Sequence, residues 1–99
     1  MILVREVFKL KIGKAKEAKA LLQEAQVLGR KYGMAEGRGL TDLTGPYYTF
    51  VWEHSYPSLA EWEQSMASST GAEEWSAWYQ KFAALLAEGG HLEIFTIVQ

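Results

Sequence analysis

The residue of this chain best suited to acid–base chemistry at neutral pH is a histidine set among aromatic side chains. His54 lies in the stretch YYTFVWEHSYPS, residues 47–58. If this stretch is a β-strand, its side chains alternate between two faces. One face then carries His54 and four aromatic residues: Tyr48, Phe50, Trp52 and Tyr56. Such an imidazole can act as a general base, with the aromatic residues shaping a substrate site. The alternative is a structural histidine that hydrogen-bonds a backbone carbonyl or caps the next turn.

A second candidate is the charged pair inside the first apolar stretch. Arg5 and Glu6 are neighbours there, so a strand would place them on opposite faces. A charge within such a strand is costly unless it is paired. The obvious partners of Arg5 are Glu53 and Glu93, which would make a structural ion pair. The alternative is that Arg5 binds the carboxylate or enolate of a substrate, with Arg5 or Tyr47 stabilising the negative charge that develops.

Metal, thiol and phosphate sites find no support in the sequence. The chain has no cysteine, which removes disulfides, thiolate ligands and cysteine nucleophiles. His91 is expected to be exposed, and Glu53 and His54 would point to opposite faces of a regular strand. Too few ligands then remain on either face to hold a metal ion. The glycines at 37–40 lack the lysine and helix of a phosphate loop. We therefore expect neither a metal nor a cofactor.

A stripe of large aromatic residues recurs at helical spacing in the second half of the chain. Its members are Trp62, Trp75, Trp78, Tyr79 and Phe82. Such a stripe is typical of a helix packed on a core, although large aromatic side chains also line pockets for flat ligands.

The elements that position these residues follow from hydrophobic periodicity and turn residues. Residues 2–12 alternate with apolar side chains on both faces, which is typical of a strand covered on both sides. Residues 14–32 change to a helical period, and Gly33 is well placed to end that helix. Residues 38–56 read as a hairpin whose first strand lies near 38–44 and which turns at Gly45-Pro46.

The second half of the chain predicts a helix and a last strand. Ser58 and Glu61 form a capping box that starts the helix, and Thr70 with Glu73 offers a second capping box after the break at 68–71. The helical spacing continues to Ala87, where Gly89-Gly90 is expected to end it. Residues 91–98 then form the last strand.

The order is therefore β-α-β-β-α-β over a single domain, residues 1–99. Right-handed crossovers and a hairpin fold this order into a four-stranded antiparallel sheet with both helices on one face, the ferredoxin-like α+β arrangement. The other face of the sheet would also be apolar, and an exposed apolar face of this size is costly in a monomer. We therefore expect a homodimer in which two copies stack through their sheets.

Composition narrows the possible partners. The hydrophobic share is 48% and the charged share 22%, as in ordinary globular proteins. Ten lysines and arginines against twelve acidic residues give a net charge of −2, which argues against a nucleic-acid binder or an anionic-membrane binder. The first ten residues lack the apolar core and cleavage site of a signal peptide, and no apolar run is long enough to span a membrane. We expect a cytoplasmic protein.

Several stretches resemble the dimeric α/β-barrel superfamily, which includes NIPSNAP-type and antibiotic-biosynthesis-monooxygenase (ABM)-type domains, and the NIPSNAP side fits better. The stretches that carry the resemblance are FKLKIGKAKEA (8–18), GPYYTFVWEHSYPSLAEWEQ (45–64), EEWSAWYQKF (73–82) and HLEIFTIV (91–98). Within them, Ile12-Gly13-Lys14 matches the family's PGK turn except for its proline. Ser58-Leu59 matches the start of the second family helix, and Glu74-Trp75 matches an acidic–aromatic pair.

The resemblance implies two chains packed through their sheets into a barrel with an apolar pocket. It implies either a cofactor-independent monooxygenase- or isomerase-like enzyme acting on a small hydrophobic molecule, or a non-catalytic module for ligand binding or dimerisation. Several ABM-type enzymes carry a histidine early in the second helix, whereas residues 60–63 contain none. The resemblance therefore carries neither a heme-handling nor an oxygen-handling site of the known kind over to this chain. If the protein is an enzyme, His54 is the expected base, and Tyr48, Trp52 and Tyr56 shape the site.

Overall fold

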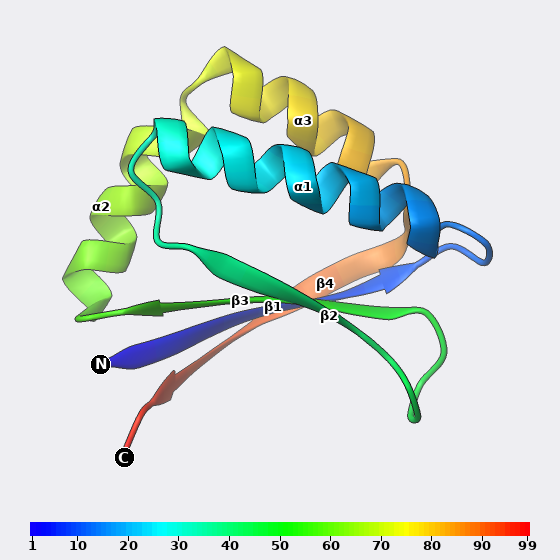
Figure 1. Cartoon of the computed structure of the whole chain (residues 1–99), viewed down its shortest axis with the longest axis horizontal. Coiled ribbons are helices and arrows are strands. Elements are labelled where there is room, and N and C mark those ends of the chain that lie inside the picture. Colours follow the sequence, from blue (N-terminus) through cyan, green and yellow to red (C-terminus); the bar gives the residue numbers. More distant parts are fainter.

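The computed structural model has the predicted ferredoxin-like order, with the second helical region split in two. The structure describes residues 1–69 and 71–99. Along the chain the elements are β1 (Ile2–Leu10), α1 (Ala15–Lys31), β2 (Gly37–Thr41), β3 (Thr49–Tyr56), α2 (Leu59–Thr70), α3 (Glu73–Ala83) and β4 (Leu86–Thr96). The strands form one antiparallel sheet in the order β2-β3-β1-β4. All three helices lie on one side of it (Figure 1).

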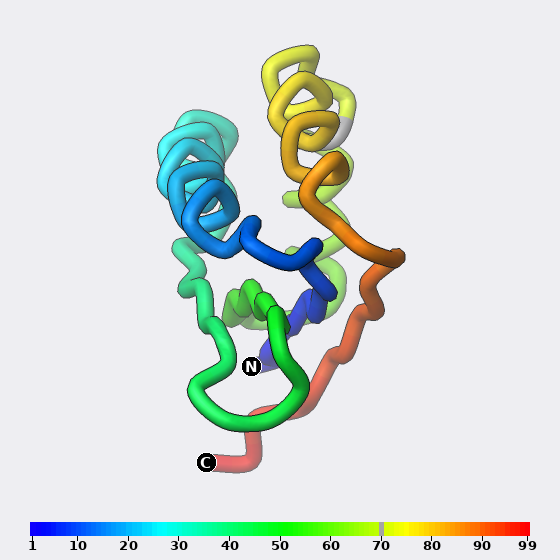
Figure 2. Tube along the Cα trace, turned by 90° about the vertical axis from the view of Figure 1, so that its right-hand side faces the viewer, coloured from blue at the N-terminus to red at the C-terminus, as the bar shows by residue number. Residues whose placement is uncertain are grey.

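The side of the sheet that carries the helices, here called the inner face, holds the core. α1 and α3 lie side by side above this face (Figure 2). The small residues Ala18, Ala25 and Gly29 are buried on α1, as the helical period predicts. They let the helix approach its neighbours closely. The buried core consists of Leu10, Ala18, Ala25, Phe50, Trp52, Trp78, Phe82 and Leu85.

The ends of α1 and α2 follow the predicted signals. α1 ends at Lys31, and Gly33 follows with a φ of 72°, a conformation that favours glycine. α2 begins after Ser58, whose Oγ accepts a hydrogen bond of 3.3 Å from the backbone N–H of Glu61. The proposed second capping box rests on Thr70, which lies outside the described residues. α3 itself begins at Glu73 without a capping bond from the side chain of Ala72.

The end of the last helix was predicted wrongly. α3 stops at Ala83 rather than near Ala87, and Gly89-Gly90 lies inside β4 instead of ending a helix. The reason is a close approach between strands: a Cβ on Gly90 would lie 2.4 Å from the carbonyl oxygen of Val7. The pairing of β1 with β4 shifts register just beyond Val7. Glycine is therefore required here by a strand contact, which local sequence patterns do not reveal.

Two further predictions on strand ends were wrong. β1 stops at Leu10, and Ile12 lies in the turn before α1 with 86% of its surface exposed. β3 starts at Thr49, so Tyr48 is not a strand residue. Tyr48 has a φ of 60° in the turn that follows Gly45, and its carbonyl oxygen accepts a hydrogen bond from the backbone of Leu10.

Candidate functional site

The site is built on the inner face of the two central strands. Along β3, the buried side chains of Phe50, Trp52, His54 and Tyr56 alternate with those of the outer face. β1 pairs with β3 so that Glu6 lies opposite Trp52 and Val4 lies opposite His54. Residues directly opposite each other in a ladder share a face. Glu6 and His54 are therefore diagonal neighbours on the inner face.

A cavity of about 530 Å³ lies between this part of the sheet and the helices α2 and α3. Its size is in the range of small-molecule sites. The lining residues are Glu6, Phe8, Met34, Trp52, His54, Met66, Trp75, Ser76, Trp78, Tyr79, Gln80 and Phe82. We call it the aromatic cavity, because six of its residues carry aromatic rings other than imidazole.

The roof of the aromatic cavity is a stack of rings on α3. Trp75 and Trp78 stack with their centroids 5.1 Å apart, and Trp78 stacks on Phe82 at 5.2 Å with an angle of 10° between the rings. Spacings of three and four residues place these side chains on one side of the helix. The indole Nε1 of Trp78 donates a hydrogen bond of 2.7 Å to the carbonyl oxygen of Leu21, which fixes the stack against α1. The part of the aromatic stripe on α3 thus serves both as core and as cavity wall, whereas Trp62 on α2 belongs to neither set.

His54 forms part of the floor of the cavity beside Trp52. Only 6% of its surface is exposed, and its ring lies 4.9 Å from that of Trp52. Burial lowers the pKa of His54 to about 4, because the imidazolium is poorly solvated there. Within residues 1–69 and 71–99, no protein group forms a hydrogen bond with the imidazole. The imidazole is therefore neutral at physiological pH.

Glu6 is the ionisable residue of the cavity that sequence reasoning did not include in the site. Burial raises the pKa of its carboxyl. No counter-ion or hydrogen-bond partner faces it among the described residues. The signal in the sequence was present: a charge in an apolar strand, on the same side as Val4 and Phe8. It was interpreted only as a charge in need of a partner.

The other predicted site residues are distributed over different places. Trp52 joins His54 at the aromatic cavity. Phe50 is buried in the core, with its ring 5.8 Å from that of Phe82. Tyr56 is buried near α2, and its hydroxyl lies 3.3 Å from the Oγ of Ser65. Tyr48 lies in the hairpin turn beside the core, so it is not brought to His54.

Arg5 lies on the opposite, outer face of the sheet, where the expected ion pairs are confirmed. Its Nε is 3.0 Å from Glu53 and its Nη1 is 2.9 Å from Glu93. Arg38 from β2 approaches the other oxygen of Glu53 at 2.7 Å. Burial acts to raise the pKa of Glu53, but the hydrogen bonds from Arg38 and Arg5 outweigh it and hold the pKa below its ordinary value. Arg5 is thus engaged away from the aromatic cavity. Tyr47 is also remote from it, with 80% of its surface exposed at the hairpin.

Three further observations on the described chain concern His91, metal ions and membranes. His91 is exposed, as expected, and lies 3.2 Å from Glu93. In residues 1–69 and 71–99, no three histidine, cysteine or acidic side chains are grouped so that they could hold a metal ion. No helix in that part of the chain combines the length and the apolar character needed to cross a membrane.

Comparisons with known proteins identify the fold. A NIPSNAP domain protein from Burkholderia xenovorans superposes with a TM-score of 0.87 at 15% identity, over 99% of this chain and 95% of that one. A NIPSNAP family protein from Agrobacterium tumefaciens gives 0.87 at 15% identity, over 98% and 85%. An antibiotic biosynthesis monooxygenase gives 0.75 at 17% identity, over 100% of both chains.

This chain has the NIPSNAP/ABM fold. The resemblance predicted from the sequence is thereby confirmed at the level of architecture. No family model matches the sequence, and no curated protein matches it. Identities of this size establish a shared fold and carry no substrate or mechanism with them. Function has to be argued from the aromatic cavity itself.

Proposed function

We propose that the protein binds a small, flat, hydrophobic molecule in the aromatic cavity and moves a proton on it without a cofactor. The observation that carries this proposal is that two ionisable groups without a polar partner among the described residues, Glu6 and His54, line one cavity. The other lining side chains are aromatic and apolar, apart from Ser76 and Gln80. Flat ligands are held by such rings through stacking. Ionisable groups kept without polar partners are uncommon in a purely structural core.

The imidazole is assigned the role of base. The Nε2–Cδ2 edge of His54 faces Gly37, so Nδ1 lies on the opposite edge of the ring and is the nitrogen we assign to proton transfer. At pH 7 the ring is neutral and ready to accept a proton. Its lowered pKa makes the imidazolium about 3 kcal/mol harder to form than in water. An enolate or phenolate formed beside it would offset that cost by direct charge pairing.

Glu6 is the second proton carrier. Because burial raises its pKa, the carboxyl is easier to protonate than an exposed glutamate and can return a proton to another atom of the ligand. Proton removal and return at different atoms is an isomerisation. A ligand anion that meets dioxygen before it is reprotonated would instead add it at carbon, and a proton would complete a hydroperoxide. Loss of water from that hydroperoxide breaks the O–O bond and a C–H bond and leaves one oxygen atom on the ligand as a carbonyl, with all electrons supplied by the ligand; this is the monooxygenase-like outcome. The name of the monooxygenase with this fold is consistent with that second outcome.

The test uses 2-tetralone, a flat bicyclic ketone with acidic protons beside its carbonyl. We expect one molecule per chain by native mass spectrometry, and faster exchange of those protons for deuterium in D₂O than in buffer alone. His54→Gln should lower the exchange rate at least tenfold while binding is retained, because a general base contributes about 10²–10⁴-fold. Trp75→Ala should weaken binding itself.

Tyr47→Ala is the matched control, because it removes an exposed aromatic ring outside the cavity. Binding without accelerated exchange would support the alternative, a non-catalytic ligand-binding module. The absence of binding to 2-tetralone and to other flat bicyclic ketones and phenols would contradict the proposal as a whole.

A second copy of the chain is the partner we propose for the outer face. Apolar side chains from all four strands gather there: Leu3, Val7, Leu40, Val51 and Phe95. Half of the surface of Phe95 is exposed, and all three helices lie on the other side (Figure 2). Sedimentation velocity should show a dimer at micromolar concentration, and Phe95→Asp should dissociate it. A wild-type monomer would contradict this proposal.

A cytoplasmic location stays a prediction from the sequence.

A further inference from the structure

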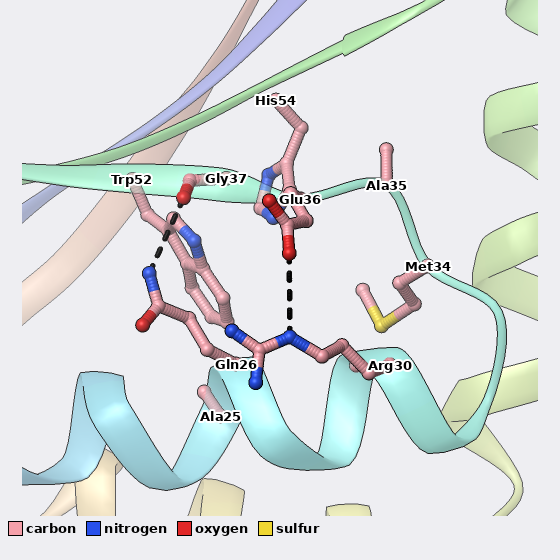
Figure 3. Close-up of a pocket in the computed structure, with 10 residues that line it drawn as sticks. Ala25, Gln26, Arg30, Met34, Ala35, Glu36, Gly37, Trp52 and His54 are labelled. Atoms are coloured by element: carbon pink, nitrogen blue, oxygen red, sulfur yellow. Dashed lines mark hydrogen bonds and ion pairs between the residues drawn. The ribbon is translucent and has the colours of Figure 1, made fainter.

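A second, smaller cavity lies behind the floor of the aromatic cavity. Its volume is about 50 Å³, and it is enclosed by the C-terminal half of α1, the segment that leads into β2, and the rings of Trp52 and His54 (Figure 3). Met34, Trp52 and His54 line both cavities. These three side chains therefore form a wall between an aromatic compartment and a more polar one.

The indole of Trp52 presents a buried donor without an acceptor at this cavity. Trp52 is 5% exposed, and its Nε1 is the one side-chain nitrogen or oxygen in the described part of the chain that is completely shielded from solvent and lacks a hydrogen-bond partner. Trp78 offers the internal contrast, because its Nε1 donates to the carbonyl of Leu21. A buried donor left unsatisfied costs about 1–3 kcal/mol. Groups of this kind in native proteins usually have an acceptor that occupies the adjoining space.

Ring nitrogens of Trp52 and His54 both lie close to Gly37. A Cβ at this position would lie 2.6 Å from Nε1 of Trp52 and 2.5 Å from Nε2 of His54. Gly37 lines the small cavity and is not among the residues of the aromatic cavity. The two nitrogens therefore converge on the side of the wall that faces α1, as Figure 3 shows for both rings.

The side chains that α1 contributes are also donors. Nε of Arg30 bonds Oε1 of Glu36 at 3.3 Å, and Nε2 of Gln26 bonds the carbonyl oxygen of Gly37 at 3.3 Å. These bonds leave the N–H groups on the two terminal nitrogens of Arg30, and one N–H of Gln26, for further hydrogen bonds. Arginine and tryptophan have no acceptor. The cavity is thus rich in donors, but Glu36 lines it too and pairs with Arg30, and Gln26 adds one acceptor oxygen. The side chains of Arg30 and Glu36 are 64% and 79% exposed, so this pair stands on the solvent side of the cavity, and a bound carboxylate would share Arg30 with Glu36.

We propose that this small cavity is a binding site for a small carboxylate, held by the indole N–H of Trp52 and the guanidinium of Arg30. A carboxylate offers acceptors only, which matches the donors on the wall and on α1. One water needs about 10–15 Å³ of such space, so a cavity of this volume admits a ligand of only a few non-hydrogen atoms, the size of formate or acetate. The site lies on the other side of the wall from the proposed catalytic compartment and goes beyond the function proposed for it.

The test observes the indole N–H directly. The protein is labelled with ¹⁵N in its tryptophan side chains and titrated with sodium acetate at constant ionic strength. We expect a saturable chemical shift change in the Nε1–H resonance of Trp52, identified by its disappearance in Trp52→Phe. The Nε1–H resonance of Trp78 should move much less, because its hydrogen bond to Leu21 is already made.

Two substitutions on α1 provide the matched comparison. Arg30→Gln removes the guanidinium at the cavity and should weaken acetate binding about fivefold or more. Lys31→Gln removes one positive charge from the next residue, which pairs with Glu74 and does not line the cavity, so acetate affinity should stay unchanged.

Equal weakening by the two substitutions, or a shift that grows linearly without saturation, would overturn the proposal. A Trp52 resonance that does not respond to formate or acetate would mean that the cavity holds water only, which also overturns it. Because the readout is the Trp52 resonance and not proton exchange on 2-tetralone, failure here leaves the proposed activity a separate question.

Discussion

Glu53 and His54 are neighbours on β3 with the same small exposed fraction, 6%, yet their surroundings differ completely. Glu53 points to the outer face and is held by Arg5 and Arg38. His54 points to the inner face and has no polar partner in the described part of the chain. β1 repeats the contrast, with Arg5 paired outside and Glu6 unpaired inside. Charged groups on the outer face are thus paired with one another, whereas the ionisable groups Glu6 and His54 on the inner face have no polar partner among the described residues.

The strongest test of this contrast removes the central charge of the outer face. Glu53→Ala leaves Arg5 with Glu93 alone and Arg38 without its partner, so we expect the free energy of unfolding to fall by about 3 kcal/mol. Urea denaturation measures it. Glu88→Ala, an exposed carboxylate on β4, is the control and should change stability by less than about 0.5 kcal/mol. A loss of similar size in both variants would remove the structural role of the network.

The inner face depends on close packing where the outer face depends on charge. Gly37→Ala places a methyl group against the ring nitrogens of Trp52 and His54, and overpacking of this kind costs about 2 kcal/mol. Gly89→Ala is the matched control within a strand, because nothing lies within 4 Å of the added Cβ. Thermal or urea unfolding of the two variants should differ clearly. Equal stability would show that the rings relax away from Gly37 without cost.

Because His54 is buried on the inner face without a polar partner in the described part of the chain, its protonation should make the free energy of unfolding depend on pH. Its pKa is about 4 in the folded chain and 6.5 in the unfolded chain. Between these two pH values the imidazole is protonated in the unfolded state and neutral in the folded state. The free energy of unfolding should therefore fall as the pH drops, by about 1.4 kcal/mol at pH 5.5 on account of this residue. His54→Gln should reduce the dependence by that amount. An identical pH profile in the variant would contradict the burial of a neutral imidazole.

Glu6 should have the smallest effect on the free energy of unfolding. Its ionisation lowers stability as the pH rises, which is opposite in sign to the effect of His54. Its raised pKa means that the folded state favours the protonated carboxyl, so ionisation at neutral pH costs stability. Glu6→Gln should raise the free energy of unfolding at pH 7 by up to about 1 kcal/mol, and the gain should vanish at acid pH. Urea denaturation at the two pH values checks it. Destabilisation at pH 7 would reveal a partner for the carboxylate.

The sequence contained most of the fold, because hydrophobic alternation and local turn signals determine these elements directly. Gly33 and the Ser58–Glu61 cap are local signals, and both were interpreted correctly. Gly90 looks identical to a helix stop, but its role depends on a carbonyl of β1 more than eighty residues away. Tyr48 continues the alternation of β3, yet the turn at Gly45 rotates it out of the strand. A long-range contact caused the first error, and the conformation of a local turn caused the second.

The candidate site was predictable only in part. The partners of Arg5 could be named, because opposite charges on neighbouring strands are few in this chain. His54 and Trp52 were assigned to one face of the strand by simple alternation, and both side chains do lie on the same face in the structure. The role of Glu6 required knowledge of which face the helices cover and where α3 leaves space above it. Neither strand periodicity nor composition contains that information.

The ring stack on α3 has an optical consequence. Trp75 and Trp78 are held 5.1 Å apart at an angle of 25°, and Phe82 extends the stack. Two indoles at this separation share their ultraviolet excitation, so their circular dichroism depends on the angle between them. A molecule that enters the space beneath the rings changes that angle or the local polarisability. The circular dichroism of the folded chain should therefore change when a molecule occupies the aromatic cavity.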